Sequence, residues 1–485
     1  WNRYPGARCD IESMQYSYQF DDALQQEWEW SERYAAQPEI LRYANHVADR
    51  FDLRRDMQFN TRVIAAAFDE SVSRWAIETS DGARTSARFC VMATGCLSSP
   101  NLPKFEGMEH FKGDHYHTGH WPHEAVDFTG KRVAMIGTGS SAVQSIPIIA
   151  EQAKQLYIFQ RTPNYAVPAH NAPLAPDYVS GIKADYPALR ARAKQTMTGI
   201  DFDYSDVKAL ETAPEARTAE YERRWQRGGL SFLGAFQDLM VSEEANDTAA
   251  EFVRGKIRDK VEDTKVAKLL EPKNTIGCKR RCIDRGYCET FNRPNVELID
   301  VSDEQIEAIT EKGVRVKGKE YEVDAIVFAT GFDAMTGALL KIDIRGRNGL
   351  QLQQKWSEGP RTYLGVAMAG FPNLFSITGP GSPSVLTNML PTIEQHVDWI
   401  AGVLAHMRER GFAAIEPDAS AEEEWVSHVG ELAGRTLRYT CSSWYLGVNV
   451  PGKPRVFMPY IGGFPRYVQH CNEIAAKGYE GFVLA

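Results

Sequence analysis

Short, continuous apolar runs punctuate the central part of the chain. The run at 131–136 is followed by the glycine-rich turn 137–142 and a helical pattern from about Ser141, and a second apolar run occupies 155–159. Two further runs, 88–95 and 325–331, end in the same Ala-Thr-Gly sequence. Unbroken apolar runs are typical of strands buried on both faces of a parallel sheet. The pattern predicts an α/β fold in which the chain leaves one nucleotide-binding domain and later returns to it.

Flanking segments show other periodicities. Pro38 precedes a predicted helix over 39–51, and two β-rich runs at 58–69 and 74–79 follow, the second turning at Asp81-Gly82. A further helix is predicted over 392–406, before an acidic helix and a loop-rich tail. Residues 175–270 are charged and helical in pattern. We therefore predict three parts: a first domain over 1–95 and 331–485, a second over 96–174 and 276–330, and a helical insertion over 175–275.

Composition narrows the class of protein. A chain of 485 residues is too long for one hydrophobic core. Its net charge of −9, without a basic block, argues against a nucleic-acid partner. No apolar run approaches the roughly 18 residues of a membrane helix. The 8 cysteines lack C-x-x-C spacing and are expected to be reduced thiols of a cytoplasmic protein.

The turn after the 131–136 run has the pattern G-x-G-x-x-A. Its first glycine permits a tight turn, its second lets the backbone approach a pyrophosphate, and the free N–H groups of the following helix face the phosphates. Alone the pattern is weak, but the preceding apolar run and following helix favour a dinucleotide site. Its candidate residues are Gly137, Thr138, Gly139, Ser140 and Ser141.

The end of the 155–159 run indicates which nicotinamide is bound. An acidic side chain there would hold the ribose 2′-hydroxyl of NAD, but this chain has Arg161-Thr162. A guanidinium and a hydroxyl suit the 2′-phosphate of NADPH. The competing interpretation is that Arg161 is an ordinary surface arginine. The lack of an acidic residue near this point favours NADPH.

A histidine-rich run precedes the glycine turn. His115, His117, His120 and His123 lie close together, but H-E-x-x-H spacing is absent, so we predict no metal site. Pro122 and the glycines indicate that the run is a loop acting as a hinge before the second domain.

Together the run and the turn resemble a known pair of motifs. F-x-G-x-x-x-H-x-x-x-W-P followed by G-x-G-x-x-A is similar to the fingerprint of type I Baeyer–Villiger monooxygenases, and similarity continues along essentially the whole chain. The fingerprint positions are Phe111, Gly113, His117, Trp121 and Pro122. The resemblance implies a flavoprotein with FAD and NADPH domains of Rossmann type. NADPH would reduce FAD, O2 would add as a C4a-peroxide, and a ketone would become an ester or lactone.

The resemblance also implies roles for residues elsewhere. Tyr4-Pro5-Gly6 precedes Asp10 with the family's spacing, which places Asp10 beside the flavin and against a catalytic arginine. Spacing from Asn292 assigns that arginine to Arg280, with Arg281 as the alternative, and makes Lys279 a third contact of the NADPH phosphate. Further cofactor contacts and a substrate loop are implied at Tyr16, Val63, Met389, Trp444 and at Ser384, Val385 and Leu386.

The beginning of the chain departs from the family pattern. It starts at Trp1, and the FAD-binding G-x-G-x-x-G of the family is not found, so the N-terminal βαβ unit of the FAD domain is expected to be missing. Two alternatives therefore stay open beside ketone oxidation: a flavin monooxygenase that oxidises sulfur or nitrogen, and a non-catalytic NADP-binding remnant. The expected partners are a small ketone and O2, with a monomeric enzyme and neither nucleic acid nor membrane.

Overall fold

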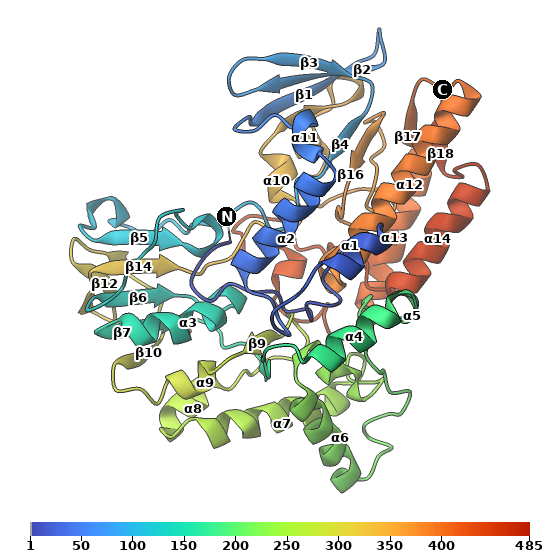
Figure 1. Cartoon of the computed structure of the whole chain (residues 1–485). Coiled ribbons are helices and arrows are strands. Elements are labelled where there is room, and N and C mark those ends of the chain that lie inside the picture. The colour runs from blue at the N-terminus through green and yellow to red at the C-terminus, as the bar shows by residue number, and fades with distance from the viewer. Residues whose placement is uncertain (1) are drawn as a thin grey trace.

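A five-stranded parallel sheet organises the part of the chain that carries the glycine turn. The computed structural model describes residues 2–485, and the sheet lies on the left of Figure 1. Its strand order is β10-β7-β6-β14-β5, with every neighbouring pair parallel. The strands are β5 (Asp114–His117), β6 (Arg132–Ile136), β7 (Gln155–Gln160), β10 (Val296–Asp300) and β14 (Ala325–Phe328).

Alternate side chains of these strands enter two separate cores. Val133 and Met135 pack on the side of α3 (Ser140–Gln152), whereas Ala134 and Ile136 pack on the opposite side. The opposite side is covered by an antiparallel sheet of β11 (Ala308–Ile309), β12 (Gly313–Val316) and β13 (Lys319–Glu322). Burial on both faces explains why the strands are continuously apolar in sequence.

A second α/β part combines the N-terminal and C-terminal thirds of the chain. One sheet has the order β15-β1-β2-β3, and β4 pairs in parallel with β16. Three long helices lie to the right of these strands in Figure 1. The elements are β1 (Val63–Asp69), β2 (Arg74–Thr79), β3 (Arg84–Ala87), β4 (Cys90–Met92), β15 (Asp343–Arg345), β16 (Leu374–Ser376), α12 (Met389–Arg410), α13 (Ala419–Gly434) and α14 (Phe464–Ala476).

Smaller elements complete this part. Antiparallel β17 (Ile415–Pro417) and β18 (Phe482–Leu484) form a two-stranded sheet beside the long helices. Near the N-terminus lie α1 (Asp22–Glu27) and α2 (Gln37–Arg50), and two short helices, α10 (Gly337–Leu340) and α11 (Leu352–Lys355), flank β15.

Helices dominate the segment between β8 (Ala166–Pro168) and β9 (Cys282–Asp284), two strands that pair in parallel. The side chains of Ser242 and Asp263 cap two of these helices, and Gly228 ends another with a positive φ of 73°. The helices are α4 (Pro176–Ala184), α5 (Tyr186–Lys194), α6 (Pro214–Arg227), α7 (Glu243–Lys260) and α8 (Thr264–Leu270), and α9 (Tyr287–Thr290) follows β9. The exact domain boundaries proposed from the sequence stay predictions.

Two expectations about local structure were wrong. The histidine-rich run is not wholly a loop, because residues 114–117 form β5, the edge strand of the parallel sheet. Its polar side chains are tolerated because one side of an edge strand has no neighbouring strand and Asp114 and His115 are exposed. The tail is also less loop-rich than expected, since it contains α14.

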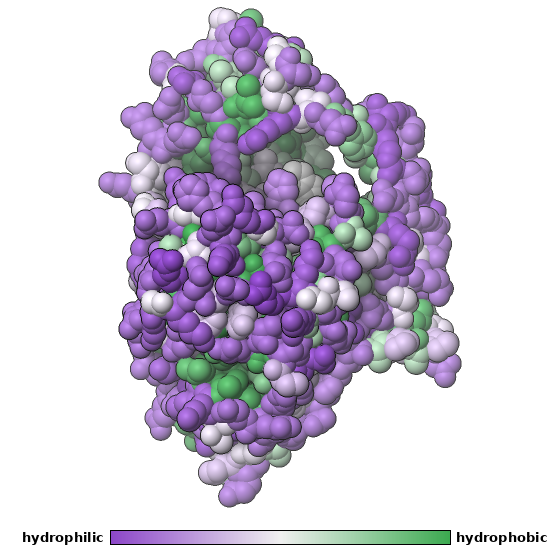
Figure 2. Space-filling view, turned by 90° about the vertical axis from the view of Figure 1, so that its left-hand side faces the viewer, coloured by the Kyte–Doolittle hydropathy of each residue, from purple (hydrophilic) through white to green (hydrophobic). Residues whose placement is uncertain are grey.

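The surface is mainly polar where Figure 2 shows it. That face is largely hydrophilic, with a hollow in its upper part where hydrophobic residues are visible. Within residues 2–485, no helix is both long and apolar enough to cross a membrane.

Candidate active site

The glycine turn lies where β6 ends and α3 begins. Gly137 has φ +106°, and a Cβ atom there would lie 2.6 Å from the carbonyl oxygen of Ala329, so a larger residue does not fit. A Cβ on Gly139 would meet nothing within 4 Å, and no side chain caps α3 at this residue. Within the described residues, the start of α3 therefore has no capping side chain and has open space beside Gly139, which fits a pyrophosphate.

Polar side chains fix the turn. The Thr138 hydroxyl donates to the carbonyl oxygen of Thr162 at 3.0 Å, which joins the ends of β6 and β7. The hydroxyls of Ser141 and Thr118 lie 3.0 Å apart, so the first turn of α3 is bonded to the histidine-rich run. The neighbouring Ser140 is the first residue of α3.

Two cations, Arg161 and Lys279, lie near the end of β7. Arg161 directly follows β7 and is exposed, while Lys279 is half-buried. Burial and the positive charge of Arg161 both lower the pKa of Lys279 below its usual value. Within residues 2–485, neither side chain has a carboxylate oxygen within 4.0 Å. This pair fits the chemistry of a 2′-phosphate, whose negative charge would relieve their mutual repulsion.

Asp10 and Arg280 form a bidentate ion pair across 270 positions of sequence. The Arg280 Nε donates to Asp10 Oδ2, and Arg280 Nη2 donates to Asp10 Oδ1 at 3.0 Å. The two side chains are only 22% and 24% exposed. The negative charge of Asp10 outweighs the effect of burial and raises the pKa of Arg280 above its usual value, so this guanidinium is a permanent cation.

Arg280 also holds the loop around η6 (Ser384–Leu386). Its Nη1 donates to the carbonyl oxygens of Val385 at 2.9 Å and Thr387 at 3.4 Å. Ser384 is fully buried, whereas Leu386 is half-buried beside the same loop. The structure therefore brings the candidate substrate loop to the candidate catalytic arginine.

The adjacent arginine has different partners. Arg281 Nη2 donates to the carbonyl oxygen of Leu230 at 2.9 Å, and Asp10 does not contact Arg281. Of the two arginines left open by the sequence, Arg280 is the one paired with Asp10.

Other candidate flavin contacts are only partly gathered here. Met389 and Trp444 pack against the apolar cluster that contains Val385 and Tyr445, next to Arg280. Tyr16 lies within reach of the charges of Asp10 and Arg280, and burial, as the largest cause, raises its pKa. Val63 begins β1, where it pairs with Thr79, and no described contact links it to Arg280.

The fingerprint residues form a connected structural unit. The Gly119 N–H donates to His117 Nδ1 at 3.0 Å, so the other ring nitrogen carries the proton that meets the Thr330 hydroxyl at 3.2 Å. Thr330 belongs to the second Ala-Thr-Gly run and donates to the Asn101 carbonyl oxygen at 2.6 Å. Burial lowers the pKa of His117, which agrees with a neutral ring.

The remaining fingerprint positions are packing positions. Trp121 is buried in the core on the α3 side, followed by Pro122, and Phe111 packs on the other side of the sheet. A Cβ atom on Gly113 would lie 2.4 Å from the Asp324 carbonyl oxygen. No group of three metal-ligating side chains is found within residues 2–485.

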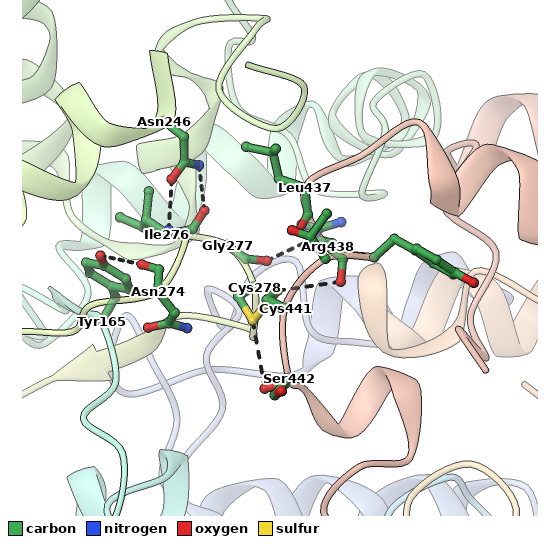
Figure 3. Close-up of a disulfide and its surroundings, with 12 residues drawn as sticks. Tyr165, Asn246, Asn274, Ile276, Gly277, Cys278, Leu437, Arg438, Cys441 and Ser442 are labelled. Carbon is green, nitrogen blue, oxygen red and sulfur yellow. Dashed lines mark hydrogen bonds between the residues drawn. A yellow bond between two sulfur atoms is a disulfide. The ribbon is translucent and has the colours of Figure 1, made fainter. Parts of the chain in front are cut away.

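One disulfide contradicts the expectation that all cysteines are reduced. Cys278 and Cys441 are bonded, with their Cα atoms 6.0 Å apart, whereas the other 6 are free thiols. Figure 3 shows that the bond joins the segment before Lys279 to the segment before Trp444. No sequence pattern indicates this pairing, because the two cysteines are separated by 163 positions and only the fold brings them together.

Comparison with known proteins agrees with this geometry. Residues 23–170 match the family model of flavin-binding monooxygenase-like proteins. A Baeyer–Villiger monooxygenase of Pseudooceanicola batsensis is 42% identical over 100% of this chain and 88% of its own length. The chain belongs to the Baeyer–Villiger monooxygenase family.

Solved structures of the family are also similar. An oxidised steroid monooxygenase bound to NADP superposes with a TM-score of 0.95 at 51% identity, covering 100% of this chain and 91% of that one. The complex of OTEMO with FAD and NADP gives a TM-score of 0.96 at 39% identity, covering 100% and 92%. The chain is therefore an NADPH-dependent flavoprotein monooxygenase that oxidises ketones to esters or lactones, as the sequence predicted.

Both cofactors suit the residues described above. The open glycine turn suits NADPH, as do Lys279 and Arg161, which pair with no carboxylate of the described residues. The half-buried apolar surface of Met389 and Trp444, beside the fixed cation of Arg280, suits the planar, electron-accepting ring of FAD.

Proposed function

We propose that Arg280 is the catalytic residue of this Baeyer–Villiger monooxygenase and that Asp10 positions it. A guanidinium has five N–H groups. Four hydrogen bonds of Arg280 are accounted for by Asp10, Val385 and Thr387. One N–H on Nη2 is left to donate to a reacting oxygen, and this single directed donor is the observation that carries the assignment.

Reduced FAD supplies the oxygen-activating chemistry when it is bound. Arg280, a permanent cation, would stabilise the negative charge that develops on the ketone oxygen. One oxygen atom of O2 enters the C–C bond beside the carbonyl, the other leaves as water, and NADPH with one proton supplies the electrons. The contacts of Arg280 to the 384–387 loop would keep the ketone close to this donor.

We assign NADPH to the glycine turn and the cation pair. The N–H groups at the start of α3 would hold the pyrophosphate, with Ser140 and Ser141 in the first turn. Arg161, Thr162 and Lys279 would hold the 2′-phosphate. The support is the open space at Gly139 and the absence, within residues 2–485, of a carboxylate partner for either cation.

Names of relatives bear on the substrate. Three relatives about as similar as the first are named for acetone, cyclohexanone and cyclopentanone oxidation, which supports small ketones. A phenazine N-monooxygenase of Lysobacter antibioticus is 38% identical over 100% of this chain, so nitrogen oxidation is the second candidate. We further propose O2 as the oxygen source and a monomeric, cytoplasmic enzyme.

Product mass after aerobic turnover tests the function. The FAD-loaded protein would be incubated with NADPH, ¹⁸O2 and separately with acetone, cyclohexanone, cyclopentanone and phenazine. We expect NADPH oxidation that depends on the ketone. We also expect an ester or lactone that carries one ¹⁸O atom. An N-oxide without any ester would favour the second candidate. Release of hydrogen peroxide alone, or no NADPH consumption with any compound, would contradict the proposed function for this panel.

Arg280→Lys tests the catalytic assignment in the same assay. Lysine keeps the positive charge but loses the fork that binds Asp10 and the loop simultaneously. We expect ester formation to fall while the rate of flavin reduction by NADPH is retained. Equal ester formation by the variant would refute the role of Arg280.

A further inference from the structure

Three arginines meet beside the candidate active site with one carboxylate between them. We call Arg280, Arg281 and Arg438 the arginine cluster. Asp10 binds Arg280 through two hydrogen bonds. Within residues 2–485, no carboxylate oxygen lies within 4.0 Å of Arg281 or Arg438. The cluster therefore holds two positive charges more than its neighbours balance.

The contacts of the two unbalanced arginines are neutral. Arg281 Nη2 donates to the Leu230 carbonyl oxygen at 2.9 Å, and Arg438 Nε donates to the Gly277 carbonyl oxygen at 3.0 Å. Arg281 Nε is buried and, within the described chain, has no hydrogen-bond partner. A buried donor without a partner is costly, and its bond is commonly completed by a ligand or water.

The cluster is also electrostatically uncompensated. Burial is the first cause that lowers the pKa of both arginines, and the charge of Arg280 lowers each further. For Arg281, the charge of Arg438 acts as well, and its pKa falls to about 10. Both side chains are half-buried, so they cannot rely fully on water for compensation. An anion between them would reverse these effects.

Two carboxylates, those of Glu12 and Asp201, line a small pocket together with Leu230 and pair with other arginines. Glu12 Oε1 lies 2.6 Å from Arg33 Nη2, and Asp201 Oδ2 lies 3.1 Å from Arg192 Nη2. Neither therefore serves the cluster. The charges of Arg281 and Arg438 are therefore left for an anionic ligand to balance.

A disulfide joins the two segments that carry the unbalanced arginines. Cys278 lies three residues before Arg281, Cys441 lies three residues after Arg438, and the two cysteines are joined. Figure 3 shows Arg438 directed from one side of this bond to Gly277 on the other. Such a link limits how far the arginines can move apart to reduce their repulsion. It keeps a binding site formed before a ligand arrives.

The proposed cofactor contacts do not account for the cluster. The charge that acts on Lys279 is that of Arg161, at the proposed 2′-phosphate site. The charges of Arg281 and Arg438 act instead on Tyr204 and Tyr445. Tyr445 belongs to the apolar cluster that contains Val385, in the proposed substrate loop. Arg281 and Arg438 are therefore associated, through Tyr445, with the proposed substrate loop and not with the 2′-phosphate site.

We propose that Arg281 and Arg438 form an anion site beside Arg280 that binds the carboxylate, or an equivalent oxyanion, of an acidic ketone substrate. This inference rests on the proposed function of Arg280. Guanidinium groups bind carboxylate and phosphate oxygens through paired N–H donors. Binding of the anion by Arg281 and Arg438 orients the carbonyl of the same molecule toward the free N–H of Arg280.

A matched pair of ketones tests the site. One is cyclohexanone with a carboxylate opposite its carbonyl, and the other is the methyl ester of the same compound, which has nearly the same shape without the charge. A third compound with a phosphonate in place of the carboxylate distinguishes the two oxyanions. Steady-state oxidation and calorimetric binding without NADPH would be measured for each.

Arg281→Gln and Arg438→Gln are the test variants, and Arg217→Gln is the control. Arg217 is also half-buried and donates to a carbonyl oxygen, that of Ala209 at 3.2 Å, but lies in α6. Loss of one charge-assisted bond should lower kcat/KM for the acidic ketone roughly 10- to 100-fold. Values for the methyl ester and the KM for NADPH should stay within about twofold, since the ester lacks the anion.

Each other outcome has a separate meaning. Equal wild-type kcat/KM for acid and ester would overturn the anion site while leaving ketone oxidation intact. A rise in the KM for NADPH in the two variants would assign the cluster to the cofactor and overturn the proposal. A third outcome separates the two proposals. Neither ketone would be oxidised, but the acid would bind more tightly than the ester, and only to proteins that keep Arg281 and Arg438. The anion site would then be supported and the proposed ketone oxidation would be contradicted. Tighter binding of the phosphonate than the carboxylate would identify phosphate-bearing ketones as the preferred class.

Discussion

Replacement of Asp10 by asparagine gives the sharpest test of the active-site geometry. The carboxylate accepts two hydrogen bonds from Arg280, at Nε and at Nη2. Asparagine keeps one acceptor oxygen and turns an NH2 group toward a cation. The free N–H of Arg280 would then lose its direction, although the guanidinium would remain in place.

The magnitude follows from these bonds. One charge-assisted hydrogen bond contributes about 1.5 to 3 kcal/mol, and the side chains are under a quarter exposed, at 22% and 24%. If most of this energy serves to orient Arg280, the barrier rises by about 3 kcal/mol, which corresponds to roughly a 150-fold lower kcat. The ordinary pKa of arginine lies far above neutrality, so Arg280 stays protonated without Asp10 and the pH profile near neutrality should not move.

The assay separates orientation from folding and cofactor binding. The rate of ester formation would be compared with the rate of flavin reduction by NADPH at equal FAD occupancy. Glu422→Gln is the control, because Glu422 is a buried partner of Lys355 at 2.6 Å, between α13 and α11. The control should lower Tm while leaving kcat nearly unchanged. A kcat for Asp10→Asn within twofold of the wild type would refute the reasoning.

Three further changes follow from the structure. Lys279→Ala should raise the KM for NADPH roughly 10- to 100-fold and change that for NADH less, because one of the two cationic partners of the 2′-phosphate is lost. In the wild type, the KM for NADPH should increase as the pH is raised, because Lys279 loses its proton and its charge. Since the pKa of Lys279 is lowered, this increase should begin before the pH reaches the ordinary lysine value of 10.5. Gly137→Ala should abolish tight NADPH binding, because its Cβ would lie 2.6 Å from the Ala329 carbonyl oxygen. Cys441→Ser should lower Tm, because the bond to Cys278 closes a loop of 163 positions, for which chain entropy predicts up to about 5 kcal/mol.

Specific results would contradict each of these. Equal effects of Lys279→Ala on the two nicotinamides would argue against a 2′-phosphate contact. Normal NADPH affinity in Gly137→Ala would mean that the turn can shift. Gly130→Ala is the control, because Gly130 also has a positive φ, of +73°, but open space surrounds it. A reductant should lower the Tm of the wild type but not that of Cys441→Ser. A Tm for Cys441→Ser equal to that of the wild type would show that the disulfide contributes no stability.

Local patterns were sufficient for much of the fold and for part of the site. The apolar runs at 131–136 and 155–159 are β6 and β7, because a strand covered on both faces needs apolar side chains throughout. The turn from Gly137 to Gly139 was readable because its function depends on backbone shape that few residues can adopt. The family motif also predicted that Asp10 contacts an arginine, and in the structure Asp10 pairs with Arg280.

Tertiary structure alone decided the rest. Arg281 was distinguishable from Arg280 only by the direction of its side chain toward Leu230, and spacing cannot supply a direction. Cys278 and Cys441 gave no local signal, because pairing across 163 positions depends on how the segment after the helical insertion and the C-terminal segment fold against each other. The sequence determined which residues carry charge, hydrogen-bond donors and backbone freedom. The fold determined which of those charges lie together without compensation, because distance and burial, and not order along the chain, set electrostatic energy.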